Sequence, residues 1–455
     1  MKKIVLALAG LALILPFACK RPSKGYCYLP IQIEYEQYFT DSTLRLDYVF
    51  CGDNKHQAIY LQAMARTGEW AGRRRNLEEP LLKGNGQIRV KDPATGLTLY
   101  SNSFSTLFQE WQSYEEAFRV QKAFENCFLV PFPKDTVDVE ISLSDIHGRQ
   151  TSFLSHRVAP SDILIRRVAN SPNECRVLME NGAVQDAIDI VVLSEGYTAA
   201  EEEKFWADAA RARDALFGHE PFASRASSFN MRAVFAPSLE SGPSVPHDGA
   251  WHNTVVSSHF DTFYMNRYLT TSSMQAVYDE LGNVPFEHII VLVNTPVYGG
   301  GGIYNSLTIM GSDHSTFVPV IVHEFGHAFG GLADEYFYSG AEENVYPADT
   351  EPWEPNITTL KDFASKWQDM LPEGTPIPTP VDSLEQQDVR RIWNTLSPEQ
   401  REVLNSKLGV YEGAGYQEKG VYRPVQECRM KINECENFCP VCTRAINRMI
   451  DYYSR

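Results

Sequence analysis

Two histidines separated by three residues stand in the segment HEFGHAFGGLADEY, which runs from residue 323 to 336. The segment continues an apolar stretch, FVPVIV, whose apolar residues recur at helical spacing. Residues i and i+4 of a helix share one face, so His323 and His327 can direct two imidazoles at one metal ion. Glu324 lies beside that face, where its carboxylate can reach a metal-bound water. This HExxH pattern is typical of peptidases that use Zn²⁺ as cofactor and the glutamate as general base.

A catalytic zinc site also needs a third protein ligand and one open position for water. The helix can end at Gly330 and Gly331, because glycine tolerates the positive φ that commonly terminates helices. The chain then turns back, and the next two carboxylates are those of Asp334 and Glu335. Both are candidates for the third ligand, and the other carboxylate would have a supporting role.

Length and charge limit the possible functions. The chain has 455 residues, 43% of them hydrophobic, and a formal net charge of −17. That length predicts more than one domain, and the apolar content is typical of globular proteins. The negative charge argues against a nucleic-acid partner and against electrostatic attachment to an anionic bilayer.

The N-terminus predicts export. Two lysines precede an apolar run over residues 4–17, which is too short to span a bilayer. We interpret residues 1–19 as a lipoprotein-type signal peptide, in which Cys19 carries a lipid and is the only attachment to a membrane. Cleavage after Ala18 and simple secretion is the alternative. The mature chain is expected as a monomer at the outer membrane or cell surface, or otherwise in the periplasm or outside the cell.

The region before the HExxH segment changes character near residue 160. Residues 20–160 predict a β-sandwich domain, because short alternating segments such as GQIRVKD, LTLYSNSF and VDVEISLSDIHG are separated by turn signals. No catalytic cluster stands out there. Residues 161–455 predict a mixed α/β catalytic domain with a mostly parallel, twisted sheet.

Three continuous apolar segments, AIDIVVLSEG, FNMRAVFAP and EHIIVLVNTP, predict the buried strands of that sheet. Thr198 followed by Glu201 predicts a capping box at the start of a long helix. GGGGIYNSLTIM, residues 299–310, is expected as an edge strand that binds an extended substrate by strand addition. RAINRMIDYYS predicts a closing helix.

Four cysteines lie close together near the C-terminus, at positions 428, 435, 439 and 442. Export permits disulfides, so two disulfides are our expectation, and the C-P-V-C pair offers half of a structural zinc site as the alternative. A polar loop lies between two of the predicted core strands. We consider two interpretations of it, a further metal site and an ordinary solvated surface. Its residues are His247, Asp248, His252, His259 and Asp261.

HEFGHAFGGLADEY, together with VYRPVQECRM and FCPVC, resembles the bacterial IgA-metallopeptidase family, a branch of the metzincin clan of zinc peptidases. The metzincin pattern places a histidine or aspartate ligand after HExxHxxGxx, and a one-residue insertion at Gly331 aligns Asp334 with that position. The resemblance therefore implies Asp334 as the third ligand and Met430 as a methionine floor beneath the metal. It also implies a metzincin-like domain with an active-site helix, preceded by a β-rich domain.

We therefore expect a zinc-dependent endopeptidase in which Zn²⁺ and Glu324 activate water. The resemblance implies immunoglobulin A as one possible substrate, and other host glycoproteins fit equally well. Tyr336, Tyr416 and Tyr422 are candidates for stabilising the oxyanion. The alternative is a catalytically inert, lipid-anchored binding or adhesion protein on a metalloprotease scaffold, although the intact Glu324 counts against it.

Overall fold

A computed structural model describes residues 33–340, 345–381 and 389–454. The predicted signal peptide and Cys19 lie outside these ranges. Among the described residues, no helix combines the length and the apolar composition needed to cross a bilayer.

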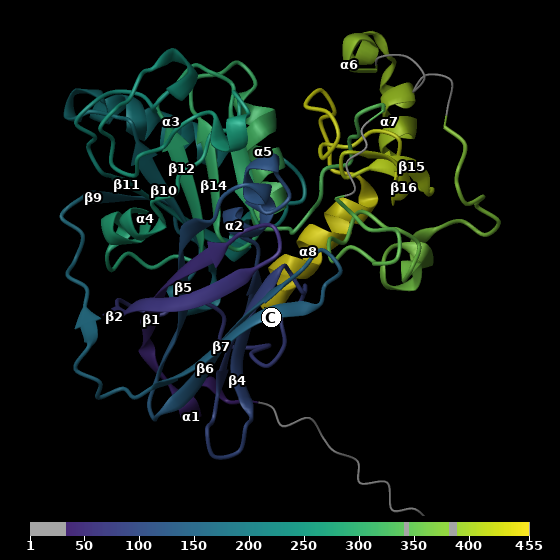
Figure 1. Ribbon diagram of the computed structural model, residues 1–455. Helices are drawn as coiled ribbons and strands as arrows, with labels where there is room; N and C mark the ends of the chain where they lie inside the picture. The colour runs from purple at the N-terminus through teal and green to yellow at the C-terminus, as the bar shows by residue number, and fades with distance from the viewer. Residues whose placement is uncertain (1–32, 341–344, 382–388, 455) are drawn as a thin grey trace, which may run out of the picture. The chain divides into compact units, whose positions relative to one another are not determined.

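The N-terminal region consists of two four-stranded sheets (Figure 1). The first has the order β5 (Lys122–Pro133), β1 (Phe39–Gly52), β2 (Gln57–Thr67) and β8 (Ile165–Arg167). The second has the order β4 (Thr98–Phe104), β3 (Gly86–Lys91), β6 (Val137–Ser144) and β7 (Gln150–Val158). Alternate residues of β6 are buried, as expected of a strand with one face on a core.

Two short helices belong to the same region. The described part of YCYLPIQIEYEQY includes one helical turn, α1 (Tyr35–Tyr38), although the segment alternates in polarity. The segment QEWQSYEEAF contains the end of α2 (Leu107–Trp111) and a short 3₁₀ turn, Glu115–Phe118.

The following region contains a six-stranded sheet whose four central strands are parallel. The strand order is β13 (Gly300–Ile303), β14 (Leu307–Gly311), β12 (His288–Val293), β10 (Ile188–Glu195), β11 (Phe229–Phe235) and β9 (Glu174–Met179). Both edge strands run antiparallel to their neighbours. The predicted single edge strand over 299–310 is instead a hairpin, and only its first arm, β13, forms the edge.

Helices cover both faces of this sheet. Alternate strand residues such as Ile190 and Ile290 pack with α3 (Glu202–Phe217), α5 (Phe317–Ala328) and α8 (Pro440–Ser454). The intervening residues, such as Val191 and Ile289, pack with α4 (Met274–Leu281). The remaining elements are the short helices α6 (Val389–Ile392) and α7 (Pro398–Ser406) and the hairpin β15 (Tyr411–Ala414) and β16 (Gln417–Arg423). The segment LKDFASKWQDML forms two 3₁₀ turns, Phe363–Ser365 and Gln368–Met370.

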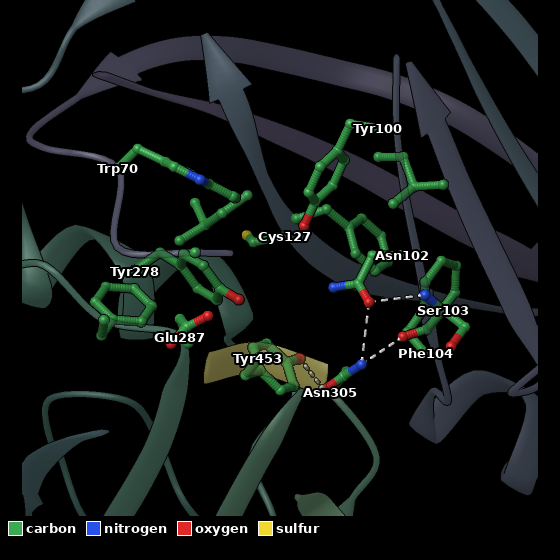
Figure 2. A pocket seen from close by; sticks show the side chains of 15 residues that line it. Trp70, Tyr100, Asn102, Ser103, Phe104, Cys127, Tyr278, Glu287, Asn305 and Tyr453 are labelled. Atoms are coloured by element: carbon green, nitrogen blue, oxygen red, sulfur yellow. Dashed lines mark hydrogen bonds between the residues drawn. The ribbon is translucent and has the colours of Figure 1, made fainter. Parts of the chain in front are cut away.

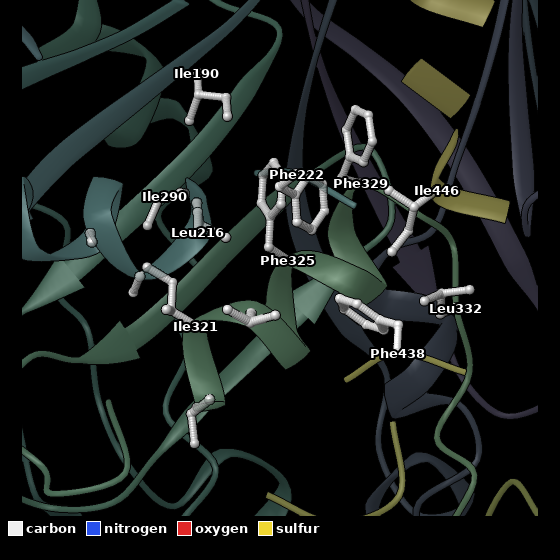
Figure 3. Packing of buried hydrophobic residues seen from close by; sticks show 14 of the residues in the cluster. Ile190, Leu216, Phe222, Ile290, Ile321, Phe325, Phe329, Leu332, Phe438 and Ile446 are labelled. Atoms are coloured by element: carbon white, nitrogen blue, oxygen red, sulfur yellow. The ribbon is translucent and has the colours of Figure 1, made fainter. Parts of the chain in front are cut away.

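Aromatic side chains hold α5 against its neighbours (Figure 3). Phe325 and Phe329 stack with ring centroids 5.3 Å apart, and Phe222 contacts both rings. Phe438 reaches the same cluster from the segment before α8. Because α5 is buried on this side, its opposite face is fixed relative to the sheet.

The turn between β13 and β14 contacts the N-terminal region (Figure 2). The Asn305 side-chain amide donates to the backbone carbonyl of Ser103 at 2.8 Å, and the Tyr453 hydroxyl donates to the Asn305 side-chain oxygen at 3.3 Å. A cavity of about 60 Å³ lies beside these contacts, between residues of the N-terminal strands and residues of the region that contains the six-stranded sheet. None of the predicted catalytic or metal-binding residues lines this cavity.

The glycines of β13 bring the strand against α5. A Cβ on Gly302 would lie 2.1 Å from the backbone oxygen of Glu324 and 2.9 Å from the His327 Cβ. Such separations exclude any side chain at this position unless the strand or helix moves. The glycine at position 302 is therefore explained by close packing against the helix that carries the HExxH residues.

Replacing Gly302 by alanine should lower the free energy of unfolding by about 1–3 kcal/mol, because the strand and helix must separate to admit the methyl group. Urea denaturation measures this change. Gly182→Ala is the matched control, since a Cβ there first meets another atom at 3.6 Å. Equal unfolding midpoints for the two variants would contradict the proposed close packing.

His288 predicts a second, acid-dependent effect on stability. Its imidazole is 5% exposed and packs edge-on against Phe329 and Tyr453, with no hydrogen-bond partner for Nε2 among the described residues. Burial lowers the pKa of His288 to about 3. Between this value and about 6.5, the unfolded chain binds a proton that the folded chain excludes. Stability should therefore fall as the pH decreases through this window.

The His288→Leu variant should lose less stability than the wild type between pH 7 and pH 4.5. The His288 contribution to the slope approaches about 1.4 kcal/mol per pH unit below pH 6.5. Unfolding midpoints measured across this range test the difference. Parallel curves for the wild type and His288→Leu would exclude this effect.

Candidate metal centre

The helix α5 presents two imidazoles on one face. His323 and His327 are one helical turn apart, and their Nε2 atoms lie 3.0 Å from each other. Their side chains are 12% and 15% exposed. The helical spacing predicted from the sequence therefore brings both Nε2 atoms to one point.

Each imidazole is oriented by a backbone carbonyl. His323 Nδ1 lies 2.9 Å from the Arg429 carbonyl oxygen, and His327 Nδ1 lies 2.6 Å from the Leu332 carbonyl oxygen. A carbonyl can only accept, so in the neutral, metal-binding form each Nδ1 carries the proton and each Nε2 keeps a lone pair. Histidines that bind metals are commonly held in this way.

Asp334 completes the group. Gly331 has φ +62°, and its turn follows α5 directly. The Asp334 Oδ1 atom lies 3.0 Å from His323 Nε2 and 3.4 Å from His327 Nε2, and the side chain is 6% exposed. The Tyr416 hydroxyl donates a hydrogen bond to the other carboxylate oxygen, Oδ2.

Charge couples these three residues. Burial alone would lower the pKa of His327, but the Asp334 carboxylate outweighs burial and raises this pKa to about 9. The two imidazoles hold the pKa of Asp334 well below its usual range, against the opposing effect of burial. The group thus requires a positive charge, which either a proton or a metal cation can supply.

The donor set fits zinc. Two imidazole nitrogens and one carboxylate oxygen lie within 4.8 Å of one another, and the two imidazoles are the groups that approach Asp334 Oδ1 among the described residues. Zinc is bound by these atom types, and three protein ligands leave one position open. His323, His327 and Asp334 would therefore hold the ion.

Glu324 lies next to this group and beside β13. A Cβ on Gly300 would be 3.6 Å from the Glu324 Cγ. Burial raises the pKa of Glu324, while the charges of His323 and His327 and the backbone N–H of Gly302 oppose that effect. A carboxylate with a raised pKa beside a metal site is suited to accept and return a proton.

Met430 packs against α5 at Gly326. Its side chain is fully buried, and a Cβ on Gly326 would be 3.0 Å from the Met430 Sδ. The glycine between the two histidines therefore admits the methionine. The backbone N–H of Glu335 donates to the Met430 carbonyl at 2.8 Å, which joins this loop to the residue after Asp334.

Glu335 faces away from the histidines. Its Oε1 atom accepts from the Asn356 amide at 2.9 Å and lies 3.1 Å from the Cys442 sulfur. Adjacent residues in this extended segment thus direct their carboxylates to different groups. Of the two candidates for the third ligand, only Asp334 lies with the histidines.

The expected disulfides are not formed. The described cysteines, including all four near the C-terminus, are free, and the Cys428 and Cys442 sulfurs are 3.9 Å apart. That separation is far longer than the bonded distance of about 2.05 Å. The prediction of two disulfides relied only on the oxidising compartment expected for an exported protein. Whether two sulfurs lie close enough to bond depends on the fold.

The three tyrosines differ in position. Tyr416 bonds Asp334, and the Tyr336 ring packs against the Tyr416 ring with centroids 5.3 Å apart. Tyr422 lies in β16, where its backbone pairs with Thr358. Tyr416 is therefore the tyrosine that directly supports the predicted metal ligands.

Sequence reasoning missed a residue from the N-terminal region. Glu110 in α2 accepts a hydrogen bond from the Tyr268 hydroxyl at 2.7 Å, and its charge interacts with those of His327, Glu324 and Asp334. Burial raises the pKa of Glu110 to about 7. No local pattern marks this residue, because its partner Tyr268 is 158 positions away.

The polar loop does not form a metal site with three converging ligands within the described residues. His247 instead pairs with Asp261, with 2.7 Å between Nδ1 and Oδ2, and the His247 side chain is 42% exposed. This arrangement fits the interpretation of the loop as a solvated surface.

Replacing Tyr416 by phenylalanine should weaken zinc binding by roughly 10–100-fold, because Asp334 loses the donor that orients it. Competition with a chromophoric chelator measures the zinc dissociation constant. Tyr422→Phe is the control and should bind zinc like the wild type, since the Tyr422 backbone pairs with Thr358 and the residue is outside the metal-binding group found among the described residues. If the zinc dissociation constant of Tyr416→Phe equals that of the control, Tyr416 does not support the metal ligand Asp334.

Comparison with family models matches residues 177–450 to the family described as IgA Peptidase M64. Residues 34–155 match the Peptidase M64 N-terminus. The first match alone spans more than half of the 455 residues. No curated protein matches the chain.

Proposed function

This chain belongs to the IgA peptidase M64 family, and from that premise we propose that it is an exported zinc endopeptidase. Family membership makes the chain a peptidase whose substrates are proteins or peptides. The metal, the catalytic residues and the site of action are our proposals. We also propose that a metzincin-like arrangement, with Met430 beneath the ligands, describes the catalytic region.

One observation carries the proposal. Two imidazole Nε2 atoms and the Asp334 Oδ1 converge within 3.4 Å, while both Nδ1 atoms lie at hydrogen-bond distance from backbone carbonyls. A histidine pair with only a structural role has no need of three converging lone pairs in a nearly buried space. The arrangement is explained if His323, His327 and Asp334 bind zinc.

Zinc held there would polarise the scissile carbonyl and lower the pKa of a bound water to about 7. Glu324 then accepts the proton of the attacking water and delivers it to the leaving amine. The Gly302 N–H favours the charged carboxylate, which lets Glu324 act first as a base. Tyr416 and the two carbonyls keep the ligands oriented through these steps.

An extended peptide is proposed to bind along β13. Within the described sheets this strand pairs only with β14, so its outer edge belongs to no ladder. The edge lies beside Glu324, as the close approach of Gly300 and Gly302 to that residue indicates. Main-chain hydrogen bonds to such an edge bind peptides with little sequence preference. Immunoglobulin A and other host glycoproteins are our proposed substrates.

Replacing Glu324 by glutamine should lower kcat by about 10²–10⁴-fold, because the amide cannot accept the proton. Zinc content should remain unchanged, since Glu324 is not a proposed ligand. Cleavage of a denatured protein substrate and elemental analysis of the same samples measure both quantities. Glu203→Gln, at an exposed position of α3, is the matched control and should keep wild-type activity.

Two results would contradict the proposal. One is a wild-type chain with full zinc that cleaves neither denatured protein nor immunoglobulin A. The other is a Glu324→Gln variant that cleaves as fast as Glu203→Gln. The first result would favour the inert binding protein over the enzyme, and the second would exclude Glu324 as the general base.

A further inference from the structure

A second group of potential metal ligands lies behind the first. The sulfurs of Cys428, Cys439 and Cys442 and a carboxylate oxygen of Glu335 all lie within 4.8 Å of one another. All four side chains are at most 1% exposed. Within the described residues this is the only other group that meets the same distance criterion.

The four residues come from three segments of the chain. Cys428 stands two positions before Met430, Glu335 directly follows Asp334, and Cys439 and Cys442 flank the start of α8. The fold therefore assembles the group from positions about 90 residues apart, although the three cysteines lie close in sequence.

Backbone N–H groups point at the sulfurs. The Cys439 N–H donates to the Cys428 sulfur at 3.3 Å, and the Cys442 N–H donates to the Cys439 sulfur at 3.4 Å. Such donors stabilise thiolate sulfur, and the second one arises from the C-x-x-C spacing. The sulfurs thus face one another with donors behind them.

Glu335 lacks a full set of partners. Its Oε2 atom is buried and has no hydrogen-bond partner, while Oε1 lies 3.1 Å from the Cys442 sulfur. A buried, unpartnered carboxylate oxygen is costly unless a cation or donor satisfies it. The charges of Arg423 and Lys431 act on Glu335 and would partly balance a negatively charged metal–thiolate group.

We propose that Cys428, Cys439, Cys442 and Glu335 bind a second, structural zinc ion. Three thiolates and one carboxylate provide four ligands, which is the closed coordination of structural zinc sites and leaves no position for a substrate. Thiolates select zinc over magnesium or calcium, which prefer oxygen ligands. Cys435 is outside the group, because its sulfur contacts Asn405 and the Asn437 carbonyl instead.

The second ion would hold the catalytic ligands in place. It would join the Asp334–Glu335 segment, the loop that contains Met430 and the start of α8. The same loop supplies the Arg429 carbonyl that orients His323. Loss of this ion should therefore weaken zinc binding at the histidine site without any change in the histidine site's own residues.

Elemental analysis of the mature chain recovered from the exported fraction tests the proposal. We expect two zinc ions per chain in the wild type and one in the His323→Ala/His327→Ala variant. Cys442→Ser should lose the second ion, and Cys435→Ser is the matched control that should retain both. Co²⁺ exchanged into the double histidine variant should give the intense near-ultraviolet absorption of cobalt–thiolate bonds.

The cobalt experiment keeps the four ligands intact, so it stays decisive if Cys442→Ser fails to fold. A wild type with one zinc ion, and a double histidine variant with none, would overturn the second site and leave the proposed function standing. A disulfide among Cys428, Cys439 and Cys442 in the intact mass would also overturn it. One zinc ion that survives histidine replacement and disappears in Cys442→Ser would instead support this site and contradict the catalytic one.

Discussion

A buried carboxylate facing two imidazole nitrogens is the interaction on which the catalytic region depends. Asp334 Oδ1 and the Nε2 atoms of His323 and His327 lie within 3.4 Å of one another, in surroundings that water barely reaches. Three electron-rich atoms at such distances need a shared cation or proton. The backbone carbonyls on both Nδ1 atoms prevent the rings from turning away. The fold thereby maintains a site that favours a bound metal.

Glycine permits the three close approaches that build this site. Gly302 lets the edge strand touch α5, Gly326 lets the Met430 sulfur pack against α5, and Gly331 reverses the chain so that Asp334 returns to the two histidines. The sequence raised the question of why helix-breaking residues accompany metal ligands. Each glycine removes a Cβ that would collide with a neighbour or, at Gly331, be strained by the positive φ.

Local patterns predicted much of the fold. The helix α5, the three buried strands β10, β11 and β12, and the closing helix α8 all lie where periodicity and apolar runs indicated. The capping box of Thr198 and Glu201 is present. These features depend on residues within a few positions of one another, which a single sequence displays.

Contacts between residues that are far apart in the sequence, and the directions of side chains after a turn, could not be predicted from local patterns. Asp334 and Glu335 are adjacent, so composition and spacing from the residues alone left the third ligand open, and the turn at Gly331 directs them to different groups. Glu110 approaches from the N-terminal region, and the cysteine group is completed by Glu335 from a distant segment. The disulfide prediction failed because the compartment does not determine sulfur positions. Long-range contacts of this kind leave no local signal.

Anomalous diffraction on either side of the zinc absorption edge, from crystals of the purified chain, tests the central claim most directly. The account predicts an anomalous peak about 2.0–2.2 Å from His323 Nε2, His327 Nε2 and an Asp334 carboxylate oxygen. Imidazoles that point to different places, with no anomalous peak between them, would contradict it.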